Sequence, residues 1–183
     1  MNQKIITLTL IITGFLSLIL DDYLLKLIPI IRLEQLNTTF IFFGSKFGLL
    51  LIGLIILFII QVSYKKKIQI KNILALGLGV ILSYAIKYTT NIPRPNILPL
   101  IQKTSPSFPS THATLGTILF LMVLSNKMKF KPVFYVASVL IIVSGFYNGV
   151  HYFSDIIMGV LLGIVVFGMV ESDYFKKKFG FLF

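Results

Sequence analysis

The sequence contains two histidines, and the second precedes an aspartate at a spacing that suits catalysis. His151 and Asp155 are four residues apart, so they can share one face of a helical turn. A carboxylate placed there can accept a hydrogen bond from one imidazole nitrogen, which fixes the tautomer and leaves the other nitrogen as a nucleophile. The alternative is a structural pair, in which the aspartate favours the positive end of a helix.

The first histidine closes the tetrapeptide 109–112 (PSTH), which directly precedes an apolar segment. Ser110 is a good N-cap candidate, so His112 would lie in the first turn of a helix. Free backbone N–H groups and the helix dipole make such a turn a favourable place for a phosphate. From there the His112 imidazole could protonate a leaving oxygen. The alternative is a capped helix that carries an interfacial histidine.

Two cations, Lys87 and Arg94, come shortly before this histidine, and Pro93 and Pro95 stiffen the backbone around the arginine. A guanidinium can bind two oxygens of one phosphate, and an ammonium adds a compact positive charge. The alternative for both is snorkelling toward lipid headgroups. Taken together, the cations, the helix N-terminus, the imidazoles and the carboxylate suit phosphoryl transfer without a metal ion or other cofactor.

The rest of the chain must position these groups, and its composition is that of a membrane protein. Hydrophobic residues make up 56% of the sequence and the mean hydropathy is +0.93, far above a soluble domain. The length of 183 residues predicts a single domain, 1–183, and the absence of cysteine excludes disulfides and thiolate metal sites. The net charge of +11 comes from lysine clusters between apolar segments, so we do not expect nucleic acid as a partner.

Six apolar segments have about the length needed to cross a bilayer. They span residues 5–20, 47–63, 72–88, 111–125, 132–150 and 153–171. No small-x-small cleavage site precedes Asp21 and Asp22, so the first segment is interpreted as an uncleaved anchor helix and not as a signal peptide.

The segment 24–43 is apolar as well, but it contains Lys26, Pro29, Arg32 and Glu34. Charges at the centre of a bilayer are costly, so we expect this segment to be an amphipathic helix at the interface and not a seventh span. The sequence therefore predicts an all-α fold, a bundle of six transmembrane helices with an interfacial amphipathic helix between the first and second spans.

The basic residues predict the orientation of this bundle in the cell membrane. With both termini in the cytoplasm, 11 of the 17 lysines and arginines fall on the inner side, as the positive-inside rule requires. These are Lys4, Lys65, Lys66, Lys67, Lys71, Lys127, Lys129, Lys131, Lys176, Lys177 and Lys178. Both histidines then lie at the outer face. Gly159 and Gly163 form a GxxxG pair, for which packing inside the bundle is expected more than a dimer face.

By its motifs the sequence resembles the type 2 phosphatidic acid phosphatases, whose site is shared with the vanadium haloperoxidases. The family patterns K-x6-RP, PSGH and SR-x5-H-x3-D correspond to segments 87–95, 109–112 and 144–155. The resemblance implies that His151 attacks phosphorus and forms a phosphohistidine, that Asp155 orients it, and that His112 protonates the leaving group. The residues that it implies to hold the phosphate are Lys87, Arg94, Ser110 and Thr111.

The sequence departs from the family patterns at two positions. Thr111 stands where the second motif has glycine, and Gly145 stands where the third motif has arginine. Losing one charge-assisted contact to a phosphate costs roughly 1.5–3 kcal/mol. Lys103 or Arg32, from the predicted outer loops, could supply the missing charge.

The resemblance implies an integral-membrane phosphatase that hydrolyses a lipid phosphate or pyrophosphate at the outer leaflet. Members of the family act on undecaprenyl pyrophosphate, phosphatidylglycerophosphate, phosphatidic acid or lipid A. One alternative is a lipid phosphotransferase, which passes the phosphoryl group to a second lipid. Another is a non-catalytic lipid-phosphate binder or transporter, which Gly145 motivates; the retained His151, His112 and Asp155 argue against it.

Overall fold

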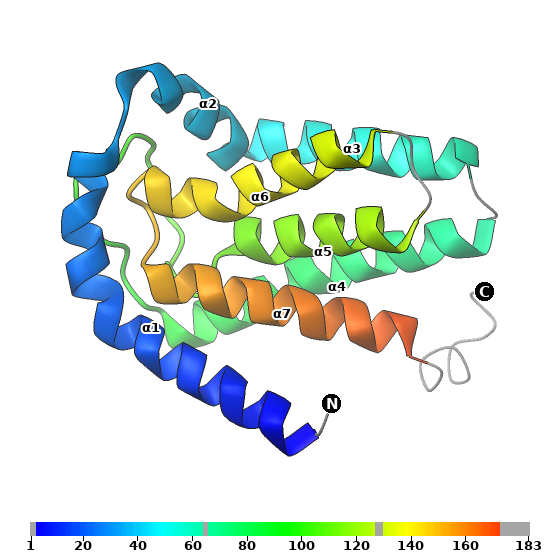
Figure 1. The fold of residues 1–183 in the computed structure, drawn as a ribbon, viewed down its shortest axis with the longest axis horizontal. Helices are drawn as coiled ribbons and strands as arrows, with labels where there is room; N and C mark the ends of the chain where they lie inside the picture. The colour runs from blue at the N-terminus through cyan, green and yellow to red at the C-terminus, as the bar shows by residue number, and fades with distance from the viewer. Residues whose placement is uncertain (1–2, 64–65, 127–129, 173–183) are drawn as a thin grey trace.

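The computed structural model describes residues 3–63, 66–126 and 130–172, and the regular secondary structure in these ranges is entirely helical. The helices are α1 (Gln3–Ile31), α2 (Glu34–Gly44), α3 (Lys46–Ser63), α4 (Lys66–Thr90), α5 (Thr111–Ser125), α6 (Lys131–Tyr147) and α7 (Phe153–Glu171). In Figure 1, α3 to α7 run side by side along the long axis, and α1 crosses one end of them obliquely. The all-α prediction is confirmed.

Each predicted apolar segment falls in a helix of its own, although α1 is longer than its segment and α6 ends before its segment does. Two helices in the described ranges, Ile70–Thr90 and Phe153–Glu171, are long and apolar enough to cross a membrane. A third span results if α2 and α3, which meet at 66°, count as one, whereas α5 and α6 are shorter apolar helices. The chain is thus a membrane protein, and the count of six spans stays a prediction.

The segment 24–43 does not form the single amphipathic helix that we predicted. Its first part is the end of α1, and a break at Arg32 and Leu33 separates it from α2. The cause is tertiary: the Tyr147 hydroxyl accepts a hydrogen bond from the Leu33 N–H at 3.1 Å and lies 3.0 Å from the Leu33 carbonyl. Backbone N–H and C=O groups that form hydrogen bonds with a side chain do not need partners within a continuous helix. Whether α2 lies at a membrane interface stays a prediction.

α5 is the central helix of the bundle, packed against α4, α6 and α7. Its buried side chains include Ile118, Leu119, Met122 and Val123, which belong to one apolar core. A Cβ atom at Gly159 would lie 2.6 Å from the Ser110 carbonyl oxygen, and one at Gly163 would lie 2.7 Å from that of Thr114. The GxxxG pair therefore packs α7 onto α5 inside the bundle, as predicted.

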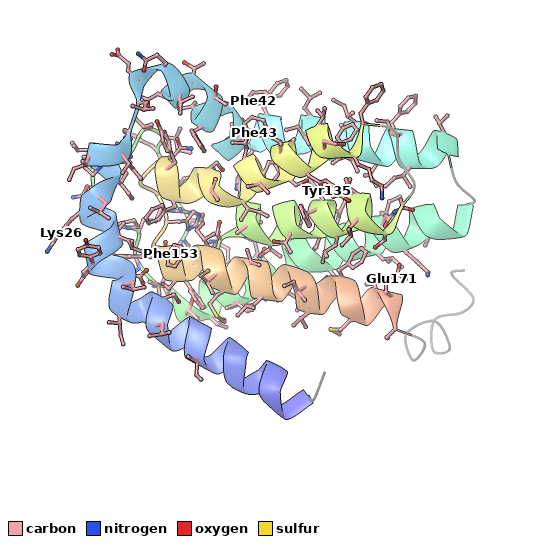
Figure 2. The ribbon with its side chains drawn as sticks, viewed as in Figure 1. Lys26, Phe42, Phe43, Tyr135, Phe153 and Glu171 are labelled. Carbon is pink, nitrogen blue, oxygen red and sulfur yellow. The ribbon has the colours of Figure 1, made fainter. Side chains whose placement is uncertain are left out.

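The segments that carry the three motifs meet at one end of the bundle. The end of α4, the loop 91–110, the start of α5 and the start of α7 lie together there (Figure 1). Figure 2 shows Lys26 and Phe153 toward this end and Glu171 toward the opposite one. The prediction that both histidines lie at the same end is confirmed.

The orientation of this end in the membrane stays a prediction. Several lysines on which it rests lie outside the residues that the structure describes: Lys65, Lys127, Lys129, Lys176, Lys177 and Lys178.

Candidate active site

His151 lies in the short turn between α6 and α7 and is 3% exposed. Its Nδ1 is 3.0 Å from Asp155 Oδ2, and its Nε2 is 3.2 Å from Arg94 Nη1. A guanidinium can only donate hydrogen bonds, so Nε2 must be the acceptor and the ring proton must be on Nδ1, where it donates to Asp155. The predicted contact between His151 and Asp155 is confirmed, and the nitrogen with the free electron pair is identified as Nε2.

The electrostatics of this turn keep His151 neutral near pH 7. Burial lowers the pKa of His151 to about 4, and its hydrogen bond to Asp155 only partly offsets that effect. The positive charge of Arg94 lowers the pKa of His151 further. A neutral imidazole whose Nε2 carries its electron pair beside a guanidinium has the arrangement that a nucleophile next to a phosphate-binding group would need.

Asp155 is held by more than the histidine. Its Oδ2 accepts hydrogen bonds from the Tyr152 N–H at 2.9 Å and from the Ser107 hydroxyl. The Tyr152 bond closes the first turn of α7, so the carboxylate both caps the helix and aims the imidazole. Our sequence reasoning missed Ser107, which is fully buried between two prolines of the loop. The available signal was a serine directly after Pro106 and two residues before Pro109, in a loop whose backbone the prolines restrict.

Arg94 is anchored by loop carbonyls before any ligand arrives. Its Nε donates to the Ser105 carbonyl at 2.7 Å, and its Nη1 donates to the Val150 carbonyl at 2.6 Å. Its Nη2 lies 3.1 Å from the Ser105 hydroxyl. Burial lowers the pKa of Arg94 and the negative charge of Asp155 raises it, while an arginine in a protein stays charged. The guanidinium is thus a fixed positive group directly against the nucleophile.

Lys87 does not have the geometry that we predicted for it. Its ammonium is 2% exposed and donates to the carbonyls of Pro106, Ser107 and Pro109 at 2.8–2.9 Å. A lysine ammonium has three protons, so these bonds use all of them. In this conformation Lys87 holds the loop that carries the second motif, and its predicted contact with phosphate stays a prediction. The sequence places a cation here correctly, but only the fold shows that loop carbonyls surround it.

The second motif begins α5 as predicted. The Ser110 hydroxyl accepts a hydrogen bond from the Ala113 N–H at 3.3 Å, which makes Ser110 the N-cap. The Ser110 N–H donates to the Asp155 carbonyl at 3.0 Å and so ties the start of α5 to the start of α7. The Ser83 hydroxyl of α4 donates a hydrogen bond to the Thr111 hydroxyl oxygen at 3.3 Å. The first turn of α5 is therefore next to the His151–Asp155 pair.

His112 is positioned by the junction of α2 and α3. Its Nε2 is 3.2 Å from the Ser45 carbonyl oxygen, which can only accept, so Nε2 carries a proton and donates a hydrogen bond to that oxygen. The other nitrogen, Nδ1, is left for proton exchange with a ligand. His112 also lies within electrostatic range of Lys103, Arg94 and His151. The two imidazoles come from separate helices and share one electrostatic site, as the sequence predicts.

Lys103 is our candidate to replace the arginine that the third motif lacks at Gly145. Its ammonium donates to the Gly44 carbonyl at 3.0 Å, and together with Arg94 it lines a cavity of about 500 Å³. Burial, together with the positive charges of Arg94 and Lys46, lowers the pKa of Lys103 to about 8. Like charges collected in a half-buried site favour a bound anion.

Arg32, the other candidate for that role, is committed elsewhere. Its Nε donates to the Tyr147 carbonyl at 3.0 Å and its Nη1 to the Leu98 carbonyl at 2.5 Å, where it supports the break between α1 and α2. Gly145 itself lies against the nucleophile, because a Cβ atom there would be 2.7 Å from His151 Cδ2. The imidazole thus packs directly on the glycine, and a larger residue would require the ring to move.

One further residue was missed because no local pattern reveals it. Asp21 of α1 is 8% exposed and accepts hydrogen bonds from the Ser154 N–H at 2.8 Å and from the Ser154 hydroxyl. It therefore holds the first turn of α7, next to Asp155, from 133 residues away in the sequence. Its position directly after the first apolar segment gave no indication of this partner.

Comparisons with known proteins identify the family of the chain. The family model of the PAP2 superfamily matches residues 70–179. Phosphatidylglycerophosphatase B of Bacillus subtilis (strain 168) is 27% identical over 117 residues, which are 58% of this chain and 58% of that protein. The aligned region thus spans less than two thirds of the length of this relative.

Two crystal structures have a similar fold. One is of a transmembrane PAP2 type phosphatidylglycerolphosphate phosphatase from Bacillus subtilis, with a TM-score of 0.68 and 23% identity over 94% of this chain and 96% of that one. The other is of Aquifex aeolicus LpxE, with a TM-score of 0.68 and 27% identity over 82% of this chain and 94% of that one. Since the family model covers more than half of the chain and includes all three motifs, the chain belongs to the PAP2 superfamily, the type 2 phosphatidic acid phosphatases.

Proposed function

We propose that this protein is an integral-membrane lipid phosphatase that acts through a phosphohistidine on His151. The observation that carries the proposal is the geometry of one imidazole. Its Nδ1–H donates to Asp155, and its Nε2 faces Arg94 at 3.2 Å. A phosphate bound by Arg94 would therefore meet the nucleophilic electron pair.

The reaction has two steps. In the first, His151 Nε2 bonds to phosphorus, the bond from phosphorus to the lipid oxygen breaks, and His112, which enters this step protonated on both ring nitrogens, gives that oxygen its Nδ1 proton. In the second, water attacks the phosphohistidine, the nitrogen–phosphorus bond breaks, and His112 takes the proton from the water. The tautomer set by Asp155 makes Nε2 available in both steps, and Arg94 balances the charge that develops on the phosphate oxygens.

In this proposal the cations have different roles. We assign Arg94 and Lys103 to phosphate oxygens, because Arg94 contacts His151 and both cations line a cavity of about 500 Å³ formed largely by their own loop. We assign Lys87 to positioning, since its ammonium holds three carbonyls of the loop 106–109. In this proposal Lys103, from the loop before the second motif, supplies the charge that the third motif lacks at Gly145.

For the substrate we propose phosphatidylglycerophosphate first, because the similar curated protein and one similar structure are named for that activity. Undecaprenyl pyrophosphate and phosphatidic acid are the other candidates. We further propose a multi-pass protein with both termini in the cytoplasm and the site at the outer face, as the positive-inside rule favours.

The test is phosphate release by the purified protein in detergent, with EDTA present, across these lipid phosphates. We expect His151→Ala to abolish release and Lys26→Ala, an exposed position on α1, to leave it unchanged. With phosphate-labelled substrate, acid quenching should trap label on the wild-type protein and none on His151→Ala. Turnover by His151→Ala at the wild-type rate would refute the proposal. Label appearing in a second lipid instead of water would show a phosphotransferase.

A further inference from the structure

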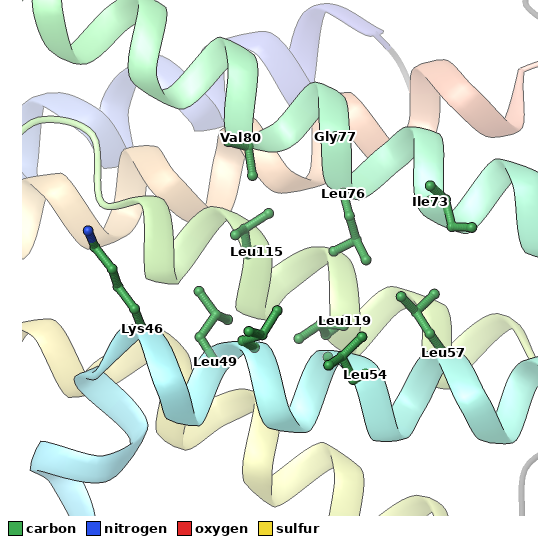
Figure 3. Close-up of a pocket in the computed structure, with 12 residues that line it drawn as sticks. Lys46, Leu49, Leu54, Leu57, Ile73, Leu76, Gly77, Val80, Leu115 and Leu119 are labelled. Carbon is green, nitrogen blue, oxygen red and sulfur yellow. The ribbon is translucent and has the colours of Figure 1, made fainter.

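The bend between α2 and α3 is formed by residues 44–48, which we call the elbow, and the two helices meet there at 66°. The Ser45 hydroxyl donates to the Phe42 carbonyl at 2.7 Å and accepts a hydrogen bond from the Gly48 N–H at 2.9 Å, so it ends α2 and caps α3. A Cβ atom at Gly48 would collide with the Phe42 carbonyl oxygen, so the bend requires glycine there. Figure 3 shows α3 beginning at Lys46, beside α5.

Two neighbouring carbonyls of the elbow hold groups of the candidate active site. The Gly44 carbonyl accepts a hydrogen bond from the Lys103 ammonium at 3.0 Å, and the Ser45 carbonyl accepts one from His112 Nε2 at 3.2 Å. The Ser45 carbonyl also accepts the first hydrogen bond of α3, from the Leu49 N–H at 3.2 Å. Its direction is therefore set by the start of the helix, and the His112 ring is held against a fixed acceptor.

The helix on the other side of the elbow is attached to the turn that carries His151. Asn148, three residues before His151, is fully buried, and its side-chain amide donates to the Phe40 carbonyl of α2 at 2.8 Å. The same amide packs on Gly44, where a Cβ atom would collide with the amide nitrogen. The ring of Tyr147 stacks on that of Phe40 with 3.9 Å between the centroids. α2 thus connects the turn of the proposed nucleophile to the carbonyl that holds the proposed acid.

We infer that the elbow positions the general acid: it holds the His112 ring with a proton on Nε2 and so reserves Nδ1 for proton exchange with the substrate. The positioning residues are Gly44, Ser45, Gly48 and Asn148. The inference rests on the proposed function and adds the residues that make His112 act through Nδ1. A ring released from the Ser45 carbonyl could turn, or carry its single proton on Nδ1 in the neutral form. A neutral imidazole is a much weaker acid than the doubly protonated ring, so either change would impair proton transfer to the leaving oxygen.

The first experiment alters the elbow with Gly48→Ala and, more mildly, with Ser45→Ala. Two variants are controls: Ser45→Thr keeps the capping hydroxyl, and Gly53→Ala lies on the same helix, where a Cβ atom meets nothing within 4 Å. The substrates are benzyl phosphate and p-nitrophenyl phosphate, which are similar in size and share the phosphate group. One releases an alcohol, which needs a proton as it leaves, and the other releases a much more acidic phenol, which does not. The quantity measured is kcat/KM, which reports the step in which that group leaves.

For Gly48→Ala we expect kcat/KM to fall about ten- to a hundredfold more for benzyl phosphate than for p-nitrophenyl phosphate, because misplacing a catalytic group by about 1 Å can cost about a hundredfold. Ser45→Ala should change the ratio in the same direction, whereas Ser45→Thr and Gly53→Ala should keep the wild-type ratio. A change in phosphate binding through Lys103 affects both substrates alike and cancels in the ratio. An unchanged ratio in the elbow variants that fold, whether both rates fall equally or neither falls, would overturn the inference.

A second experiment needs no turnover. The chain has two histidines, and NMR of protein labelled at the imidazole nitrogens shows which nitrogen of each ring carries a proton. We expect the proton on Nδ1 of His151 and on Nε2 of His112, with His151→Ala to assign the signals. In Gly48→Ala the His112 proton should be shared between both nitrogens, and in Gly53→Ala both rings should match the wild type.

A wild-type His112 without a proton on Nε2, or a His112 signal unchanged in Gly48→Ala and Ser45→Ala, would overturn the inference. Failure of the wild-type protein to release phosphate from any substrate would instead refute the proposed function alone, because the position of the ring proton is measured without turnover.

Discussion

Replacing Asp155 with asparagine tests the role of its carboxylate in holding His151. In the native structure Oδ2 of this side chain accepts hydrogen bonds from His151, Tyr152 and Ser107. Asparagine has nearly the same shape but no charge. Its amide oxygen is expected in the place of Oδ2, because three donors converge there and Arg94 keeps His151 Nε2 an acceptor. The substitution therefore removes the charge that holds the imidazole and leaves its tautomer unchanged.

The magnitude follows from the contact that is lost. Asp155 is 1% exposed, so its charge-assisted bond to the imidazole is not screened by solvent. Such a bond contributes about 1.5–3 kcal/mol, which corresponds to a ten- to 150-fold loss of kcat at about 1.36 kcal/mol per tenfold. We therefore expect Asp155→Asn to reduce kcat by about ten- to 150-fold.

The assay is the pH profile of phosphate release. It also reports a second effect, the change in the pKa of His151, whose direction follows from the structure. Asp155 raises the pKa of His151 against the effect of burial, and the net pKa is about 4. Without the carboxylate that pKa must fall, so the acid limb of kcat/KM should move from near pH 4 to lower pH while kcat decreases. A kcat within threefold of the wild-type value, or an acid limb that moves to higher pH, would refute the assignment of Asp155 and of the tautomer. A general loss of folding would remove activity without moving the limb.

Two further predictions concern residues that only the fold identifies. Lys103→Met should raise KM for the lipid phosphate about tenfold, from one lost charge-assisted contact. Because the pKa of Lys103 is about 8, the wild-type protein should lose substrate affinity as pH rises through 8, and the variant should lack this pH dependence. Steady-state kinetics between pH 6 and 10 measure both effects. An unchanged KM in the variant would count against a role of Lys103 in binding phosphate. Asp21→Ala should lower the unfolding free energy by about 1–3 kcal/mol, because the buried N–H and hydroxyl of Ser154 lose their acceptors. Thermal unfolding in detergent measures that loss, Asp22→Ala is the exposed neighbouring control, and equal stability of the two variants would contradict the structural role.

The helices themselves follow from the sequence. Apolar segments of the required length predict the positions of the helices, because backbone groups in a membrane must be satisfied within the segment. The second motif predicts its own N-cap, since Ser110 acts on a residue three positions away. The pairing of His151 with Asp155 is equally local, as four residues separate them.

Interactions across the chain could not be predicted in the same way. The break at Arg32 and Leu33 depends on Tyr147, which lies more than a hundred residues away. The sequence identifies Lys87 as a cation near the site, but the fold surrounds its ammonium with loop carbonyls and so makes it a positioning residue. It is likewise the fold that brings Lys103 to the phosphate cavity.

By itself, then, the sequence determined which residues could carry out the chemistry and which segments are helical, because both depend on residue type and short spacing. The tertiary structure decided which cation contacts His151 and which nitrogen of His151 accepts a hydrogen bond. Those outcomes depend on which donor finds which acceptor between distant segments, and hydrogen-bond partners at that separation are chosen by packing and not by local sequence.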